Sequence, residues 1–265
     1  MLELKGIKKT FNQGTPNQKV ALGGIDLTIK EGDFITVIGG NGAGKSTLLN
    51  AIAGVWKIDE GSIVLDGEDI TRLPEHKRAK FLGRVFQNPS TGTAADMQII
   101  ENLALAARRN KKRGLGWGVK AKEKEEYKEL LTRFDLGLEN RMGQKVGTLS
   151  GGQRQALTLL MASLSNPKLL LLDEHTAALD PKTAKKVLTL TDEIIERDKL
   201  TAIMITHNMN DAITHGNRLI MMDSGKVIFD VEGEEKKKLT ISDLLEKFEK
   251  ITGEEMASDK MILSK

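Results

Sequence analysis

The segment from Gly39 to Thr47 constrains the fold of this chain more than any other. Its sequence, Gly-Gly-Asn-Gly-Ala-Gly-Lys-Ser-Thr, fits the phosphate-binding pattern G-x-x-x-x-G-K-[ST]. In that pattern the backbone amides surround phosphates, the lysine reaches the terminal phosphates, and the hydroxyl binds Mg²⁺. The segment therefore predicts a site for a nucleoside triphosphate with Mg²⁺.

The residues on either side of this segment support the same prediction. Residues 34–38 are apolar or β-branched without interruption, which is typical of a buried parallel strand. Residues 45–53 predict a helix that ends at Gly54. The glycine-rich segment thus joins a strand to a helix N-terminus, where amides and the helix dipole favour an anion. An ordinary strand-to-helix turn is the alternative, and this placement argues against it.

A second motif, Leu-Ser-Gly-Gly-Gln, occupies residues 149–153. Ser150 and Gln153 form the S-x-x-[EQ] pattern of a capping box, which predicts a helix that continues to Ser163. A glycine-rich helix N-terminus also offers amides to a phosphate. Helix initiation and phosphate binding are therefore both open for this motif.

Two further segments place polar residues directly after apolar strands. The run of four leucines at 169–172 ends in Asp173 and Glu174, and His207 follows the strand-like residues 201–206. In open α/β sheets, ligands bind at the carboxyl ends of the parallel strands. The alternative for the two acids is that they only mark the end of a strand. The alternative for His207 is a structural role.

These segments together resemble the ATP-binding subunit of ABC transporters. The motif at 149–153 is the signature of that family, and the similarity extends from about Met1 to Phe229. The resemblance implies an α/β fold, with a P-loop NTPase core that has a mostly parallel sheet, a flanking antiparallel β subdomain and an inserted helical subdomain. The alternation of strands and helices in the second half independently predicts a parallel sheet.

The expected organisation is one ATPase domain at 1–232 with a helical subdomain inserted at about 88–166. Residues 233–265 are expected to form a helical tail, in which residues 239–248 have helical apolar spacing after a possible cap at Ser242. Within the first domain, residues 62–70 predict a hairpin around Asp66-Gly67.

The resemblance also implies roles for individual residues. Lys45 would pair with the β and γ phosphates, Glu174 would act as general base, and His207 would contact the γ phosphate. Gln87 would reach Mg²⁺ and the attacking water and couple them to a membrane partner, although a glutamine before Asn88-Pro89 could equally start a turn. The residues expected to bind ATP are Phe11, Gly39, Gly40, Asn41, Gly42, Ala43, Gly44, Lys45, Ser46, Thr47, Ser150, Gly151, Gly152 and Gln153, and those expected to bind Mg²⁺ are Ser46, Gln87 and Asp173.

Phe11 and the signature motif carry separate expectations. By resemblance Phe11 stacks on adenine, although it could instead be a core residue. In the family the motif at 149–153 binds the γ phosphate of ATP that the opposite subunit holds. We therefore expect an ATP-driven homodimer that sandwiches two nucleotides. Asp180-Pro181 predicts a helix N-cap with proline at the first position, and also matches the family's dimer-interface loop. His175 stands where many relatives have proline.

Composition limits the remaining choices. The chain has 265 residues, no cysteine and a net charge of +3, which does not argue for nucleic acid. No stretch is long and apolar enough to span a membrane, so transport would require separate permease subunits. We expect a peripheral protein on the cytoplasmic face of the membrane, in a system that includes an extracytoplasmic solute-binding protein.

The cargo is open at this stage. Residues 173–181 and 206–210 resemble subunits that accompany importers for amino acids, including aromatic ones. The alternative function is a soluble ABC ATPase in translation or DNA repair, but such proteins typically carry tandem cassettes or long coiled coils. The basic run at 108–113 and the glycine-rich run at 114–118 predict a solvated loop or, alternatively, a contact with acidic lipid or a permease.

Overall fold

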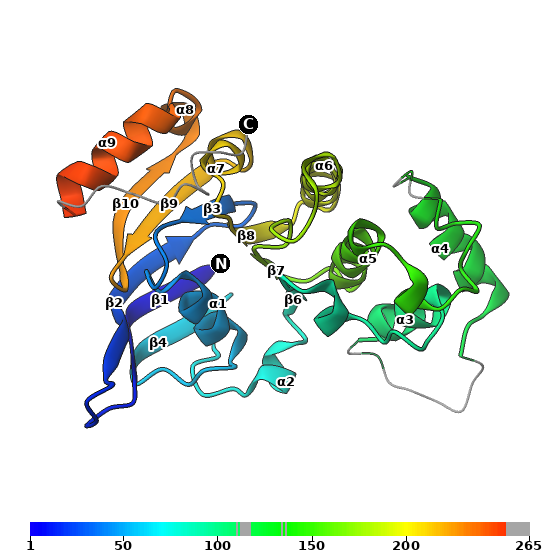
Figure 1. Cartoon of the computed structure of the whole chain (residues 1–265). Helices are drawn as coiled ribbons and strands as arrows, with labels where there is room; N and C mark the ends of the chain where they lie inside the picture. Colours follow the sequence, from blue (N-terminus) through cyan, green and yellow to red (C-terminus); the bar gives the residue numbers. More distant parts are fainter. Residues whose placement is uncertain (110, 112–117, 134, 136, 253–265) are drawn as a thin grey trace. The chain divides into compact units, whose positions relative to one another are not determined.

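The computed structural model describes residues 1–109, 111, 118–133, 135 and 137–252 (Figure 1). It divides into two compact units. The first comprises Met1–Leu82 and the described part of Leu200–Lys265, and the second comprises Gly83–Lys199. The units are described one at a time.

An antiparallel sheet forms much of the first unit. Its strand order is β2 (Lys19–Ile29), β1 (Leu2–Phe11), β4 (Glu60–Leu65) and β5 (Glu68–Asp69). Leu65 pairs with Glu68 across the Asp66-Gly67 turn, so the predicted hairpin is confirmed. Both turn residues have positive φ, which matches the right-handed twist of the strands that they join.

Parallel strands form the other sheet of the first unit. β3 (Phe34–Ile38) pairs in parallel with β8 (Thr201–Ile205) and with β9 (Arg218–Asp223), and β10 (Lys226–Glu232) lies antiparallel to β9. Every residue of β3 and β8 is buried, as expected for parallel strands covered on both faces. Parallel and antiparallel sheets therefore coexist as predicted.

Two helices of the first unit are tied together by one arginine. α1 (Lys45–Ala53) ends as predicted at Gly54, which has φ 83°. Arg78, the last residue of α2 (Glu75–Arg78), is 2% exposed. Its guanidinium donates to the carbonyls of Ala51 and Ile52 at 2.8 Å each. These bonds satisfy carbonyls that a helix C-terminus otherwise leaves unpaired.

The chain after β10 forms α8 (Gly233–Lys237) and α9 (Ile241–Thr252). Leu244 and Phe248 of α9 are buried in one apolar cluster with residues of β9, β10 and α7 (Met209–Thr214), and Figure 1 shows α9 beside β10. The predicted cap at Ser242 is wrong. Thr240 caps the helix instead, because its hydroxyl accepts from the Asp243 amide at 3.2 Å while the Asp243 carboxylate accepts from the Thr240 amide at 2.8 Å.

The described part of the second unit holds two strands and several helices, most of which lie within residues 88–166. β6 (Leu82–Val85) neighbours β7 (Leu169–Asp173), and residues 169–172 are completely buried. The remaining elements are η1 (Pro89–Gly92), α3 (Ile99–Ala107), α4 (Ala121–Arg133), η2 (Val146–Thr148), α5 (Gly151–Ser163) and α6 (Pro181–Asp198). Among the described residues of both units, no helix has the length and apolar character required to cross a bilayer.

Candidate nucleotide-binding site

The loop between β3 and α1 has the geometry of a phosphate cradle. Gly44 sits at the N-cap of α1 with φ 99°, and Lys45 is only 5% exposed. The Lys45 ammonium donates to the carbonyls of Gly39 at 2.7 Å and Gly40 at 3.0 Å, so the side chain folds back over its own loop. The predicted strand–loop–helix arrangement is therefore present, with the loop at the positive end of the helix dipole.

The β2 strand and the β9–β10 turn hold this loop from outside. A Cβ atom on Gly44 would lie 2.5 Å from the carbonyl oxygen of Ala21, so no side chain fits there. The Gly225 amide, in the β9–β10 turn, donates to the carbonyl of Ala43 at 3.0 Å. The loop conformation therefore depends on strands that are distant from it in sequence.

His207 lies at the same sheet edge as this loop. It follows β8, which pairs in parallel with β3 through Val37 and Ile205. The Thr206 amide donates to the carbonyl of Val37, which continues this ladder to the residue before the histidine. After His207, Asn208 caps α7 by accepting from the Asn210 and Asp211 amides. Adjacent parallel strands therefore bring His207 and the loop to one edge.

Phe11 ends β1, where it pairs with Lys19 of β2. The Lys19 ammonium lies 3.1 Å from the position that a Cβ atom on Gly42 would occupy. Phe11 also makes an edge-to-face contact with Trp56, a residue that the sequence analysis did not single out. No sequence signal could have paired these two aromatics, because 45 positions separate them.

In the second unit, Asp173 and Glu174 follow the fully buried leucines of β7 as predicted. Both side chains are partly buried. Glu174 has φ 48°, a conformation that turn residues such as Asn and Asp adopt far more readily than Glu. The Glu174 carbonyl accepts from the Ala177 amide at 3.0 Å, which forms the turn after the strand. Glu174, at the end of the strand, thus adopts a sparsely populated backbone conformation.

Gln87 is exposed and lies in the second unit between β6 and η1. Asn88 does start a turn there, because its side chain accepts from the Ser90 amide at 2.9 Å. Beside it, Gln155 of α5 donates to the carbonyl of Phe86 at 3.2 Å. The residue that initiates the turn is therefore Asn88 and not Gln87. The backbone just before Gln87 is hydrogen-bonded to α5, the helix that begins at the signature motif.

The signature motif opens α5 with the predicted capping box. The Ser150 hydroxyl accepts from the Gln153 amide at 3.3 Å, and the Gln153 side chain accepts from the Ser150 amide at 3.2 Å. A Cβ atom on Gly152 would lie 2.0 Å from Cγ2 of Thr183, so close packing against α6 requires this glycine. Gly151 is exposed, and a Cβ atom there would meet only Leu179 at 3.6 Å. Packing therefore explains Gly152 but not Gly151.

Two other predictions fall in this unit. Asp180 caps α6 by accepting from the Thr183 amide at 3.1 Å, with Pro181 in the first turn. Hydrogen bonding to Thr183 lowers the pKa of Asp180 below its ordinary value. His175 is 2% exposed, and its Nε2 lies 3.1 Å from the Thr191 hydroxyl of α6. Its ring is thus built into the packing of the second unit.

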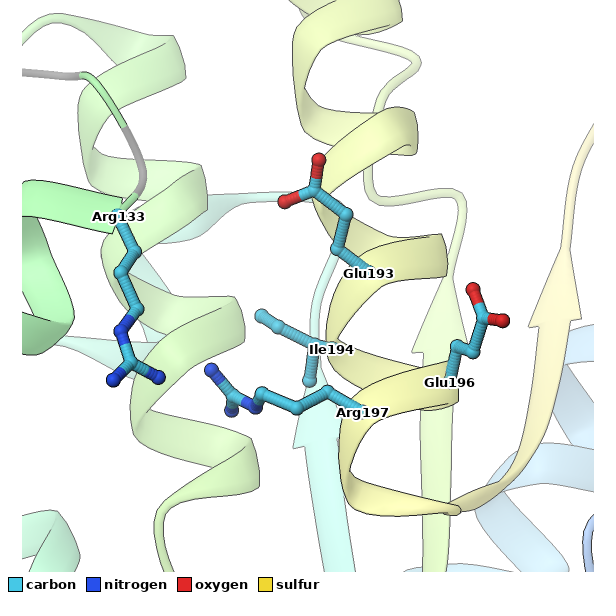
Figure 2. Close-up of a pocket in the computed structure, with 5 residues that line it drawn as sticks. All are labelled: Arg133, Glu193, Ile194, Glu196 and Arg197. Atoms are coloured by element: carbon cyan, nitrogen blue, oxygen red, sulfur yellow. The ribbon is translucent and has the colours of Figure 1, made fainter.

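A cavity of about 320 Å³ opens between α4 and α6 in the second unit (Figure 2). Figure 2 shows Arg133 and Arg197 extending toward one another across it, with Glu193 and Glu196 on α6. None of the predicted nucleotide-binding residues lines this cavity. The candidate site is therefore defined by loop and strand-end geometry rather than by this pocket.

The predicted site residues divide between the two units. The first holds Phe11, the loop at 39–47 and His207, whereas the second holds Gln87, residues 150–153, Asp173 and Glu174. In the part of the chain that the structure describes, no three His, Cys, Asp or Glu side chains cluster as metal ligands. Most of the basic and glycine-rich segment at 108–118 lies outside the described residues, as does the end of the tail.

Comparison with known proteins gives concordant results. The family model described as ABC transporter matches residues 22–177. The chain is 45% identical, over 249 residues, to the tyrosine transport ATP-binding protein of Clostridioides difficile (strain R20291), a match that covers 94% of this chain and 99% of that protein. It is 35% identical, over 230 residues, to the spermidine/putrescine import ATP-binding protein PotA of Haemophilus influenzae (strain ATCC 51907 / DSM 11121 / KW20 / Rd). That match covers 87% of this chain but only 57% of PotA.

A solved structure is similar to most of this chain. It is the dimeric structure of a post-hydrolysis state of an ATP-binding cassette bound to ADP and Pi. The TM-score is 0.74 at 32% sequence identity, and the match covers 88% of this chain and 98% of that one. Similarity at this level extends to both units described above.

Proposed function

Because this chain belongs to the ABC transporter family, we propose that it is the ATP-hydrolysing motor subunit of an importer whose membrane-spanning permease is made by other chains. The chain is an ATPase with the P-loop NTPase fold of the ATP-binding cassettes. The observation that carries the proposal is the coexistence of the phosphate cradle around Lys45 and the signature at the start of α5. The alternative of a soluble ABC ATPase in translation or DNA repair finds no support in the comparisons.

Binding of ATP is assigned to the first unit and to the signature of a second copy. Lys45 exchanges its bonds to its own loop carbonyls for the β and γ phosphates, and residues 39–47 supply amides. Phe11 stacks on the base. Its partner in the strand pair is Lys19, whose ammonium lies next to Gly42 of the phosphate loop. Gly151 is exposed, and internal packing does not explain why a glycine stands there. Because it has no side chain, it leaves room for a phosphate at the start of α5.

Hydrolysis is assigned to residues at strand ends. Glu174 accepts the proton of the attacking water, and its left-handed backbone conformation is the kind of strain that functional sites retain. His207 contacts the γ phosphate from the strand beside the loop. Gln87 orients the water and, as an exposed residue after β6, transmits the nucleotide state to a permease.

The proposed Mg²⁺ ligands suit that ion. Ser46, Gln87 and Asp173 offer hydroxyl, amide and carboxylate oxygens, which are the hard ligands that Mg²⁺ prefers. The described residues hold no dedicated cluster of three acids or histidines, which agrees with a Mg²⁺ that takes most of its ligands from phosphate and water. When bound, Mg²⁺ would neutralise charge that develops on the phosphates during hydrolysis.

The proposed assembly has three kinds of component. Two copies of this chain form a head-to-tail dimer in the ATP-bound state, and each lends its signature to the other. The dimer docks on permease subunits at the cytoplasmic face of the membrane, and a solute-binding protein delivers the cargo. We propose residues 1–232 as the ATPase domain, with the helical insertion at about 88–166, and residues 233–265 as a tail. By similarity to the tyrosine transport protein, the cargo is an amino acid, with tyrosine as the first candidate.

Three measurements test this function. ATPase activity per chain should fall on dilution, because a shared site requires two copies. Constant activity per chain far below the pairing concentration would contradict the shared site.

Affinity purification of the tagged chain from its native membranes should recover a permease, and transport of labelled tyrosine should stop when the chain is deleted. Recovery of ribosomes or DNA in place of a permease would contradict the transport role.

A further inference from the structure

The contact between Phe11 and Trp56 forms an aromatic pair on the surface of the first unit. The ring centroids are 5.3 Å apart and the ring planes meet at 83°, which is the favourable edge-to-face arrangement. Trp56 remains 43% exposed, so part of the indole is open to solvent. A pair of this kind is placed to meet a ligand as well as to hold one ring in position.

A second contact holds the Phe11 ring. The Lys9 ammonium lies 5.5 Å from the ring centroid, within the range of a cation–π interaction. Lys9 is itself fixed, because its side chain is only 15% exposed and its ammonium pairs with Asp59 at 2.8 Å. The other oxygen of Asp59 accepts from the Thr10 amide at 2.6 Å. Phe11 is therefore part of a connected cluster rather than an isolated surface ring.

The cluster is tied to the phosphate loop at two points. Phe11 pairs with Lys19, whose ammonium lies next to Gly42. The Trp56 backbone amide donates to the carbonyl of Asn50 at 3.3 Å, so the backbone of Trp56 is bonded to the last turn of α1. The same helix begins with Lys45 at the phosphate loop. One short helix and one strand pair thus connect the aromatic pair to the phosphate loop.

Resting on the proposed function, in which Phe11 stacks on the nucleotide base, we propose that Trp56 is a positioning residue that fixes the plane of the Phe11 ring and favours a purine base over a pyrimidine. A base that lies flat on Phe11 is nearly perpendicular to the indole, as the two rings meet at 83°. Such a base would thus meet a fixed stacking surface. A preordered ring loses less freedom on binding, and the larger purine gains more from it.

The first test compares ADP and CDP binding to the full chain and to its Trp56→Ala variant. ADP should bind about 2- to 10-fold more weakly to the variant, which is the range that one edge-to-face pair contributes. CDP affinity should change less, so that the purine preference shrinks. ATPase assays should show the change in KM, with kcat within about twofold. Trp56→Phe should retain most of the affinity, because it keeps an aromatic edge.

The second test uses tryptophan fluorescence. The chain contains two tryptophans, so the Trp117→Phe variant leaves Trp56 as the single indole. ADP should change the emission of this variant, whereas inorganic tripolyphosphate, which lacks a base, should change it much less. An equal response to both probes, or no response to ADP, would overturn the proposal.

The outcomes separate this inference from the proposed function. If Trp56→Ala leaves ADP affinity and the purine preference unchanged while Phe11→Ala weakens ADP binding, the role of Trp56 is refuted and the stacking role of Phe11 stands. If neither variant affects ADP binding while Lys45→Ala abolishes it, the base does not lie on Phe11 at all, and both assignments fall together.

Discussion

The helices α1 and α5 both begin at a proposed phosphate-binding segment, but they begin in different ways. At α1 the N-cap is Gly44, which has no side chain, and its backbone is held by packing against Ala21. At α5 the N-cap is Ser150, whose hydroxyl and amide are already bonded to Gln153. The N-terminus of α1 is shaped by packing against a distant strand, whereas the N-terminus of α5 is capped by the side chains of its own first residues.

In the proposed dimer, this difference means that the two halves of the nucleotide site act at different times. In the proposed site, the Lys45 ammonium would leave the carbonyls of its own loop for the phosphates, and one copy supplies this half of the site by itself. In the proposed dimer, the α5 end would exchange some of its capping bonds for contacts with the nucleotide of the partner. Such an exchange yields little net free energy unless the second copy is already close. ATP binding would then precede dimer closure.

The largest expected effect comes from Glu174→Gln, which separates binding from hydrolysis. Loss of a general base should lower turnover by about 10²- to 10⁴-fold, while ATP remains bound at both helix ends. Size-exclusion chromatography with ATP should therefore show an accumulated dimer. The matched control is Glu196→Gln on α6, which should hydrolyse ATP normally. Full turnover by the Glu174 variant would exclude this residue as the base.

A smaller but selective effect is expected for Ser150→Arg. The long cation should obstruct the approach of a partner's phosphate and remove its contacts, so turnover should fall by about 10²-fold. Binding of ADP to the single copy should stay within about twofold of the original chain, because α1 is untouched. Equal losses of ADP binding and of turnover would argue that the signature does not act across two copies.

Gly44→Ala tests whether the fold itself shapes the α1 end. The new methyl group would lie 2.5 Å from a backbone oxygen, at a φ of 99° that favours glycine. We expect a loss of about 2 kcal/mol in the free energy of unfolding and a fall of about 5 °C in the apparent Tm. Gly40→Ala is the control, because a Cβ atom there meets nothing within 4 Å. Equal Tm values for both variants would contradict this account of the loop.

The smallest effect is expected for Ser150→Ala, which removes the capping hydroxyl without adding bulk. A lost N-cap costs about 1 kcal/mol, so the apparent Tm should fall by about 2–4 °C. Ser150→Gly should cost only a few tenths of a kcal/mol. If the alanine variant were as stable as the original chain, the capping box would not contribute to the stability of α5.

Local features were predictable because a few neighbouring residues determine them. The end of α1 at Gly54, the cap at Asp180 and the capping box of α5 all depend on bonds within about four positions, and the phosphate loop was predictable from its glycine and lysine pattern. The cap at Ser242 was misplaced, since Thr240 and Asp243 form an equally local pattern two residues earlier. β9 and β10 were not predicted, although a Ser-Gly turn between their apolar residues gave a usable signal.

The sequence by itself determined that this chain has a P-loop, a signature motif and strand-end acids, since short-range hydrogen bonding and backbone preference specify them. Only the tertiary structure decided that Trp56 meets Phe11, that Gly225 bonds to the loop at Ala43, and that α9 packs on β10. These contacts join residues that lie far apart along the chain. Many competing pairings could bury similar apolar area, and strand register and packing of the whole unit select among them.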